Sequence, residues 1–463
     1  MLSSYFQIFG CLVKTVAACA FLAALSFSAQ AAESCPDLSR FYLPSVTLQN
    51  SQSNDNQVDW PLLERQLAGI KLDCLESSEF FALHGAAQLN SGLINESLES
   101  LERALLLDPN NGAAQIDYGQ ALFQQGQLFM ALELNERLLQ REDLPKALQP
   151  ALRVRQQAWK ALTRQKSFQV DALGGYDNNL NGAPSPDQVT LTLSGEAIPL
   201  TLDTDFRPES GPYLNLRLGS RYRTLAPNHQ HNWATEVRAR TSEDSASNLV
   251  QLNSRYAYIN ADDDHSWQVN GGLSHLNFSG SALFSGLDAS VRYQTNGSAV
   301  CKPYYDVAVQ YQNYHEQVFL NGVESKLSAG LRCPLGPASG SHRLSAEIGM
   351  LNNRALDSTR LGGNRNGWQF KADWQKPAAG GLFRAEVSHI QLDDSKGYSE
   401  LLASGADRDL SRSYMLVQFR KPVAALGSNS SLLINIYRQS QNSNIEFFRT
   451  DSTSAEIGLS WSF

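Results

Sequence analysis

The end of the chain alternates strictly between apolar and polar positions. In "TSAEIGLSWSF" one face is small or charged and includes Glu456, while the other face is apolar: Ala455, Ile457, Leu459, Trp461 and Phe463. Such a strand is expected where one side meets lipid and the other a wet lumen. A soluble β-sandwich would also alternate, so this strand alone leaves both folds open.

The same alternation recurs from Ser167 onward in about fourteen segments. They lie near 168–180, 212–224, 231–242, 249–259, 266–278, 283–295, 300–314, 323–333, 342–352, 365–376, 381–392, 411–421, 430–440 and 452–463. An even number is expected of an antiparallel barrel whose two ends lie on one side. We therefore predict a transmembrane antiparallel β-barrel of about 14 strands over 167–463.

The connections between these segments alternate in length. The long ones are at 181–211, 353–364, 393–410 and 441–451, and the first of them itself alternates, as a surface hairpin would. Short turns face the periplasm and long loops face outward in outer-membrane barrels. The last strand then runs toward the periplasm and the first strand away from it, which predicts that everything before the barrel is periplasmic.

Between about Trp60 and Leu162 the period is helical instead. Two similar units follow each other, with Gly85 and Gly119 separated by 34 residues, which is the tetratricopeptide period. The residues expected to pack where the helices cross are Gly85, Ala104, Gly119 and Ala131. Helices near 57–72 and 147–162 would cap the array. A peptide-binding groove and a rigid spacer are equally compatible with this pattern.

The chain is thus expected to be an α+β multidomain protein. Residues 1–31 resemble a secretory signal peptide, with Lys14, an apolar run from Thr15 to Phe27 and the small-x-small site Ala29-Gln30-Ala31. A polar arm follows at 32–56, then the α-helical tetratricopeptide domain at 57–165 and the barrel at 167–463. An outer-membrane location, with the repeats in the periplasm, follows from this order.

Composition narrows the possible partners. The chain has 46 acidic against 38 basic residues and no basic patch, which argues against nucleic acid. No Cys-x-x-Cys motif or Cys and His cluster predicts a metal site, and no cofactor is expected. Four cysteines follow the signal and allow three pairings. Cys35 with Cys74 would tie down the arm, and Cys301 with Cys333 would join neighbouring strands at one rim.

Two sets of barrel residues have a predicted role. Aromatic residues at the periplasmic ends of the strands should form a girdle at the water boundary: Trp233, Tyr256, Tyr258, Trp267, Trp374, Trp461 and Phe463. Charged residues on the opposite faces should point into the lumen: Arg217, Arg221, Arg238, Arg240, Arg255, Glu236 and Glu456. Charges of both signs are compatible with a salt-bridged lumen or with an open passage.

The stretch "GGYDNNLNGAPSPDQ" (174–188) resembles half of a calcium loop. Asp177, Asn179, Asn181 and Gly182 fit the pattern, but its twelfth position is Gln188 instead of a bidentate Glu, and "SFQVDALGGY" before it alternates as a strand. We therefore interpret the Asp and Asn residues as turn-formers where the first strand ends.

The order of a signal, a short tetratricopeptide array and a barrel of about fourteen strands opened by "GGYDNNLN" resembles the surface lipoprotein assembly modulator (Slam) family. The resemblance implies an outer-membrane translocator that delivers client proteins, either lipoproteins or small exported proteins, from the periplasm to the cell surface. It also implies contact with outer-membrane lipids and with the outer-membrane assembly machinery. The cysteine pairs and the 182–211 insertion depart from the family pattern.

Two other classes of protein fit parts of this pattern. A polysaccharide-export porin also joins tetratricopeptide repeats to a barrel, but its lumen should carry aromatic platforms and carboxylates, whereas the lumen predicted here is rich in Arg. A barrel-embedded hydrolase would need a nucleophile beside its base. His275, His315 and His389 lie near long loops with no serine-containing elbow beside them, so no enzyme is expected.

Overall fold

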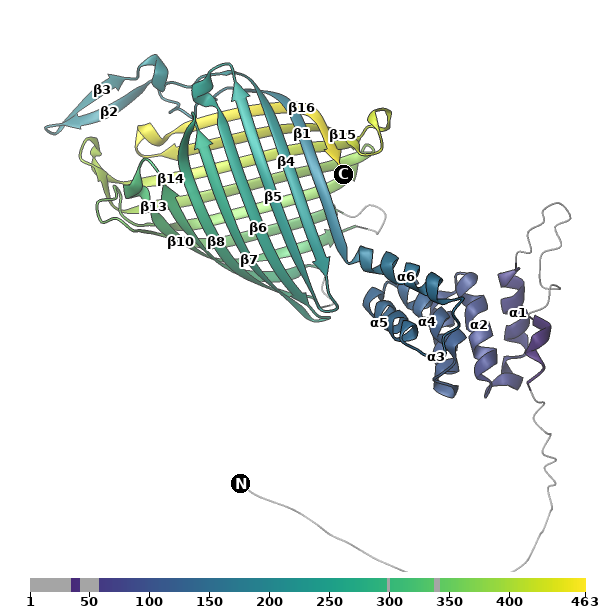
Figure 1. Cartoon of the computed structure of the whole chain (residues 1–463). Helices are drawn as coiled ribbons and strands as arrows, with labels where there is room; N and C mark the ends of the chain where they lie inside the picture. The colour runs from purple at the N-terminus through teal and green to yellow at the C-terminus, as the bar shows by residue number, and fades with distance from the viewer. Residues whose placement is uncertain (1–34, 42–57, 298–299, 337–341) are drawn as a thin grey trace, which may run out of the picture. The chain divides into compact units, whose positions relative to one another are not determined.

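The structure is a computed structural model that describes residues 35–41, 58–297, 300–336 and 342–463. The chain divides into two compact units, Met1–Arg153 and Val154–Phe463. The predicted signal peptide and most of the predicted arm lie outside the described residues. Figure 1 follows the chain from the helices to the strands.

The first unit is helical. Its α-helices in the described part of the chain are α1 (Trp60–Gly69), α2 (Ser78–Asn90), α3 (Ile94–Leu107), α4 (Gly112–Gln124), α5 (Leu128–Leu139) and α6 (Gln149–Leu162), the last of which crosses the division between the units. Side-chain oxygens of Asp59, Ser77 and Asn111 cap α1, α2 and α4. None of the described helices is long and apolar enough to cross a membrane.

Glycines separated by 34 residues recur at two kinds of position in this unit. Gly92 and Gly126 adopt positive φ angles of 82° and 88° in the turns after α2 and α4, a conformation that favours glycine. Gly85 faces α3 so closely that a Cβ atom there would lie 2.5 Å from Cγ of Leu101. The Ser97 hydroxyl donates a 2.7 Å hydrogen bond to the Gly85 carbonyl across the same contact. These two helices can pack this closely only because no side chain separates them.

The other predicted packing residues are also buried. Ala104 and Ala131 are fully buried, and Gly119 is buried in α4. Cys35 and Cys74 form a disulfide, as expected from the sequence. This bond attaches the short 3-10 helix Leu38–Phe41, with Leu38 buried, to the core of the helical unit.

The second unit is a β-barrel. Fourteen strands form its wall: β1 (Arg164–Asp177), β4 (Gly211–Leu225), β5 (His229–Ser242), β6 (Leu249–Ala261), β7 (His265–Phe278), β8 (Ser281–Thr295), β9 (Lys302–Tyr314), β10 (Gly322–Leu335), β11 (His342–Ala355), β12 (Arg365–Ala378), β13 (Gly381–Ser399), β14 (Leu402–Pro422), β15 (Ser430–Ser443) and β16 (Thr450–Ser462). Each overlaps a segment predicted from alternation, and all but β13 and β14 have their ends within a few residues of it.

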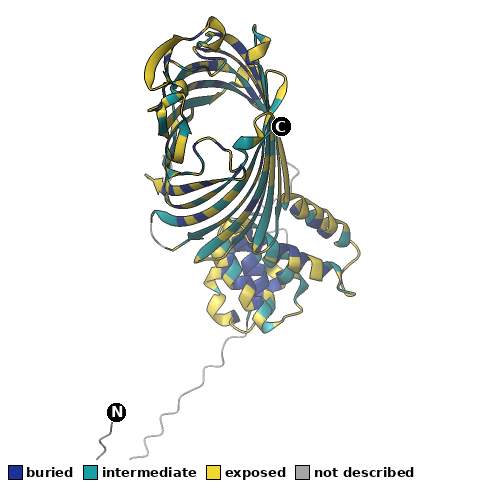
Figure 2. Ribbon diagram, turned by 90° about the vertical axis from the view of Figure 1, so that its left-hand side faces the viewer, coloured by how far each residue is buried: buried dark blue, intermediate teal, exposed yellow. Residues whose placement is uncertain are grey.

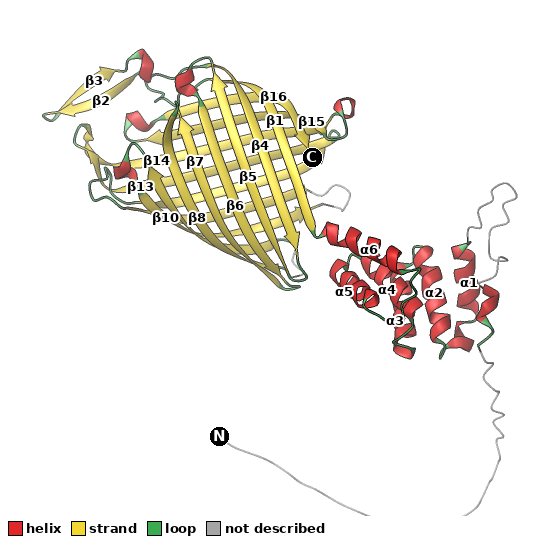
Figure 3. Cartoon of the chain, viewed as in Figure 1, coloured by secondary structure: helices red, strands yellow, loops and turns green. Residues whose placement is uncertain are grey.

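The wall is a closed antiparallel ring. Each strand pairs with the next along the wall, β13 pairs with β14, and β16 pairs with β1 to close the ring. Figure 3 shows the strands crossing the unit at a common tilt. Closure leaves no free strand edge. The predicted fold class, helices followed by a barrel of 14 strands, is confirmed.

The two rims of the barrel differ in their connections. The short-turn rim carries tight connections such as 226–228 and 262–264, and the chain enters β1 there. The opposite rim, the long-loop rim, carries the 178–210 insertion, in which β2 (Gln188–Leu193) and β3 (Glu196–Thr201) form the expected hairpin. The β7–β8 turn on this rim is short, at 279–280.

One predicted loop is wrong. The sequence predicts a long loop at 393–410, but β13 continues to Ser399 and β14 starts at Leu402. The two strands keep pairing beyond the rest of the wall, through register shifts around Gly397. A β-bulge absorbs extra residues while the hairpin continues, so broken alternation in this segment did not mean broken pairing.

Exposure alternates along the strands, and Figure 2 shows exposed residues in yellow between buried or intermediate ones on the barrel strands. In β1, Asp171 and Leu173 are buried while Val170 and Ala172 point the other way. Register carries this parity around the ring. The predicted girdle residues all lie near the short-turn rim at outward positions, with Trp233 and Phe463 more than half exposed. Cys301 and Cys333 form a disulfide at this rim.

Candidate functional site in the barrel lumen

The lumen is lined by the polar faces of the strands. Strand pairing places every predicted lumen charge at an inward position, in register with Asp171 of β1. Arg217 pairs with Asp171 on one side and with Arg238 on the other, and the same parity holds for the remaining predicted charges: Arg221, Glu236, Arg240, Arg255 and Glu456.

Two buried carboxylates organise the wall around the closure of the ring. Asp171 is fully buried, 3.4 Å from Nη1 of Arg217. Glu456 accepts hydrogen bonds from Tyr213 (3.0 Å), Asn215 (2.7 Å), Asn435 (3.0 Å) and Tyr437 (3.1 Å). Arg238 lies 3.7 Å from the same carboxylate. Hydrogen bonds and ion pairs of this number offset the cost of burying a carboxylate and fix the neighbouring strands to one another.

Further charge pairs support the opposite side of the ring. Nζ of Lys326 lies 2.9 Å from Glu347, and the hydroxyl of Tyr304 donates to the same carboxylate at 3.0 Å. On β12 and β13, Arg384 lies 2.6 Å from both Asp373 and Glu386. Much of the predicted mixed charge therefore forms ion pairs within the wall.

A large cavity remains between the walls of the barrel. Its volume is about 1110 Å³, and its lining extends from Phe168 and Ser462 at the short-turn rim to Leu276 and Phe284 near the long-loop rim. Its charged lining residues are Arg217, Arg221, Glu236, Arg255, Asp288, Arg384 and Arg420. Fourteen strands enclose more space than side chains fill, so this part of the lumen is open.

Positive charge predominates in this cavity. Within the part of the chain that the structure describes, the guanidinium groups of Arg221 and Arg420 have no hydrogen-bond or ion-pair partner, whereas Arg217 lies 3.8 Å from Glu236. Free guanidinium groups of this kind interact favourably with carboxylates and phosphates. The cavity is therefore suited to anionic groups.

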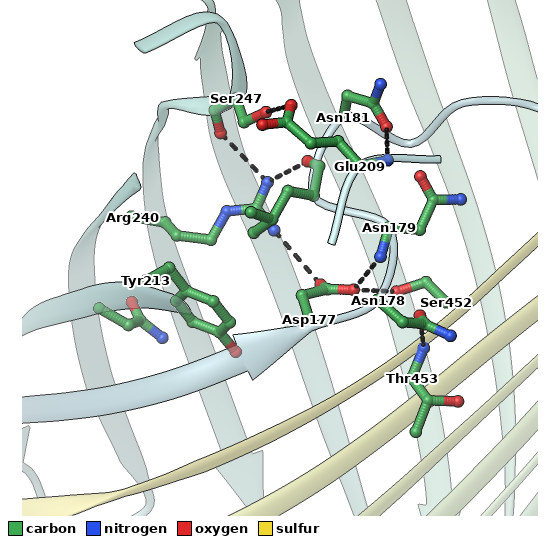
Figure 4. A network of polar contacts seen from close by, with 12 residues as sticks. Asp177, Asn178, Asn179, Asn181, Glu209, Tyr213, Arg240, Ser247, Ser452 and Thr453 are labelled. Atoms are coloured by element: carbon green, nitrogen blue, oxygen red, sulfur yellow. Dashed lines mark hydrogen bonds and ion pairs between the residues drawn. The ribbon is translucent and has the colours of Figure 1, made fainter. Parts of the chain in front are cut away.

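Near the long-loop rim the "GGYDNNLN" segment anchors the first loop to the wall (Figure 4). Oδ1 of Asp177 accepts hydrogen bonds from the backbone of Asn179 and the hydroxyl of Ser452, both at 2.9 Å. Its other oxygen lies 3.7 Å from Arg240, which also donates to the Leu180 carbonyl at 2.8 Å. The oxygens that resembled calcium ligands are thus occupied by turn and inter-strand contacts.

Sequence reasoning missed three buried charges of the lumen. Asp171 shares its strand face with Gln169 and Leu173, so the alternation of β1 in the sequence was sufficient to predict that it points into the lumen. Asp394 lies 3.1 Å from Arg408, and both residues are buried. Both residues lie in the 393–410 segment, where the sequence predicts a loop and strand alternation is therefore not expected to assign a face.

Comparisons with known proteins give fold-level similarity. No family model matches the chain, and no curated protein matches it. The barrel region is similar to a FadL homologue from Pseudomonas aeruginosa (9% identity, TM-score 0.34, covering 65% of this chain and 90% of that chain). It is also similar to an outer membrane channel from Pseudomonas putida F1 (9% identity, TM-score 0.33, 64% and 95% covered).

The helical region is similar to the type III secretion translocator chaperone SycD from Yersinia enterocolitica, with 18% identity, a TM-score of 0.21, and 22% of this chain and 73% of that chain covered. None of these values carries functional information. The class of protein follows from the strands themselves: an even-numbered, closed antiparallel ring with an apolar exterior and a polar lumen is an outer-membrane-type β-barrel. It is preceded by a helical unit in the same chain.

Proposed function

We propose that this chain is an outer-membrane translocator that delivers a client protein, a lipoprotein or a small exported protein, from the periplasm to the cell surface. The observation that carries the proposal is the cavity of about 1110 Å³, which reaches across the barrel. A site for a drug-sized ligand has a volume of roughly 300–1,000 Å³ and is enclosed. A cavity that joins opposite walls instead suits a substrate that passes through.

The helical unit supports a polypeptide client. Stacked helical hairpins form extended concave surfaces that bind peptides. Leu106 on α3 and Met130 on α5 are 70% and 54% exposed. These two apolar side chains lie on the solvent-facing side of helices whose other face packs into the core. In the proposal the unit lies in the periplasm, receives the client through such side chains and releases it to the barrel, whose exterior contacts outer-membrane lipids.

The positive charge of the lumen favours a client whose transported segment is acidic. Arg221 and Arg420 project free positive charge into the cavity from different sides of the ring. We therefore expect charge reversal at both positions to reduce transport of an acidic segment because attraction becomes repulsion. The control is Arg354→Glu, since Arg354 has the outward parity on β11 near the long-loop rim.

The test is a deletion strain complemented with the wild-type chain, the Arg221→Glu/Arg420→Glu variant or the control. Surface lipoproteins are measured by protease shaving of intact cells, and total lipoprotein is measured in lysates. The proposal is supported if the deletion strain displays less lipoprotein on its surface at an equal total amount. The wild-type chain and the control should then restore the display, and the double variant should not. An unchanged surface proteome on deletion overturns it, and loss of surface glycan instead would favour polysaccharide export.

A further inference from the structure

A second cluster of polar side chains lies at outward positions of β7 and β8, on the parity of Leu273 and Leu287. Nδ1 of His275 lies 2.8 Å from the hydroxyl oxygen of Ser285, and Nε2 of the same ring lies 3.0 Å from Oδ1 of Asn277. Nε2 of His315 lies 2.8 Å from the same serine oxygen. The sequence singled out both histidines but found no serine beside them, because Ser285 belongs to the neighbouring strand.

The donor and the acceptor of each hydrogen bond in this cluster can be assigned from Asn277 onward. Oδ1 of Asn277 can only accept, so Nε2 of His275 carries the proton that it donates there. In a neutral imidazole this leaves Nδ1 of His275 as an acceptor, to which the hydroxyl of Ser285 donates its hydrogen bond. The serine oxygen then accepts from Nε2–H of His315. A serine polarised by a histidine that an amide holds in one tautomer is the arrangement of an activated nucleophile.

The position of the cluster suggests its substrate. Leu273, Leu287 and Tyr311 form one outward row across β7, β8 and β9, and each is at least 42% exposed. The next outward row toward the β7–β8 turn is His275, Ser285 and Asn313. The serine therefore lies where the continuous apolar band gives way to a polar row, and Leu283, 38% exposed, is the next outward residue of β8 toward the turn. In a bilayer the ester bonds of lipids lie at this boundary between hydrocarbon and head groups.

We propose that Ser285, His275 and Asn277 form a hydrolase site for the acyl esters of membrane lipids. Ser285 Oγ attacks the ester carbonyl carbon as its proton moves to Nδ1 of His275. The tetrahedral intermediate collapses, the alcohol leaves with that proton, and the acyl group stays on Ser285. Water then attacks the acyl-serine, giving its proton to His275, which returns it to Oγ as the fatty acid leaves.

The other two residues assist these steps. Asn277 is a positioning residue, because it contacts His275 and fixes which ring nitrogen is free to accept the proton. His315 places an N–H donor at the serine oxygen, and the donor can shift to the acyl oxygen as negative charge develops there. The activity concerns the lipid-facing surface and does not depend on the transport proposed for the lumen.

A matched control exists on the same barrel. Nδ1 of His389 lies 3.0 Å from the hydroxyl of Ser413, also at outward positions of neighbouring strands. Within the described residues, however, Nε2 of His389 has no hydrogen-bond partner, and no second imidazole contacts Ser413. Ser413 is therefore expected to be unreactive although its surroundings are otherwise similar.

The test uses the full chain folded in phosphatidylethanolamine vesicles, with a fluorophosphonate probe and mass spectrometry of the labelled peptide. We expect label on Ser285 and release of fatty acid from the vesicles. Both should be lost in Ser285→Ala and retained in Ser413→Ala. His275→Ala should lower both by about 10²-fold or more, the range for loss of a general base. Heat-shifted gel mobility establishes that each variant has a folded barrel.

Asn277 supplies a second readout. Asn277→Asp should keep the labelling and change its pH profile, whereas Asn277→Leu should lose most of it. The proposal is overturned by folded wild-type protein that takes no label at Ser285, by equal labelling of Ser413, or by fatty-acid release that persists in Ser285→Ala. It is also overturned if Asn277→Leu labels like the wild type with the same pH profile.

Discussion

The hydroxyl of Tyr213 on β4 donates a 3.0 Å hydrogen bond to Oε1 of Glu456 on β16 across the intervening strand β1. The two side chains meet because Gly175 is the β1 residue in register with both. A Cβ atom at Gly175 would lie 2.6 Å from Cζ of Tyr213 and 2.9 Å from the Ala455 carbonyl oxygen. A glycine of the "GGYDNN" segment thus permits the contact that spans the closure of the barrel.

Substituting Gly175 should therefore weaken the barrel. Gly175→Val would displace Tyr213 from Glu456, and a hydrogen bond to a charged group contributes about 1.5–3 kcal/mol. Gly174→Val is the control, because a Cβ there meets nothing within 4 Å. Urea unfolding in detergent, followed by heat-shifted gel mobility, should show a lower midpoint for Gly175→Val alone. Equal midpoints for the two variants would contradict this role.

Removing the Glu456 carboxylate should lower the free energy of unfolding more than Gly175→Val does. Glu456→Leu leaves four hydrogen-bond donors and Arg238 facing a buried apolar side chain, and breaking a buried ion pair in this way costs about 3–5 kcal/mol. Glu236→Gln is the comparison, because Glu236 is half exposed and 3.8 Å from Arg217. Loss of this exposed pair should lower the free energy of unfolding by less than about 1 kcal/mol. The same unfolding assay distinguishes them, and a mild effect of Glu456→Leu would show that the network is dispensable.

The helical unit should lose stability in mild acid. Burial lowers the pKa of His84, and the Glu64 carboxylate, 3.6 Å away, offsets part of that effect. The unfolded chain thus takes up a proton at higher pH than the folded one. Stability is full above about pH 6.5, the ordinary histidine pKa, and falls below it by at most about 1.4 kcal/mol per pH unit.

Hydrogen exchange of α2 amides in the full chain between pH 5 and 8 measures this effect. His84 is the sole histidine before the barrel, so His84→Gln should remove the slope in this range. If the pH dependence of stability persists in His84→Gln, a group other than His84 causes it.

The disulfide between Cys35 and Cys74 should stabilise the helical unit selectively. The two residues are 39 positions apart, and closing a loop of that length stabilises the fold by about 4 kcal/mol in the chain-entropy description. Cys35→Ser/Cys74→Ser should raise hydrogen exchange in α1 and α2. Cys301→Ser/Cys333→Ser is the control, and it should leave the exchange of these helices unchanged because its bond lies within the barrel.

The cavity should favour anions. Five arginines, Arg217, Arg221, Arg255, Arg384 and Arg420, line it against Glu236 and Asp288. In a planar bilayer with a KCl gradient, the reversal potential should indicate anion preference, and Arg221→Glu/Arg420→Glu should shift it toward cations. The outward Arg354→Glu control should not shift it. Cation preference in the wild-type barrel would contradict the account of the lumen.

The sequence by itself determined the class of fold, the strands and their faces. Alternation has a period of two residues and is a local property, so fourteen segments, the inward parity of Arg217 and the outward parity of Trp233 could all be predicted from it. The 34-residue spacing of Gly85 and Gly119 likewise placed the helices. Cysteine position, combined with strand order, was sufficient for Cys301 and Cys333.

The tertiary structure decided which residues meet. Register between strands is set by the whole ring, so residues far apart in the chain, such as Tyr213 and Glu456 or Asp171 and Arg217, become neighbours without any local signal. The same cause brings Ser285 to His275, although the sequence around that histidine indicated no nucleophile. Local periodicity shows which face a side chain occupies, but only closure of the barrel fixes its partner on that face.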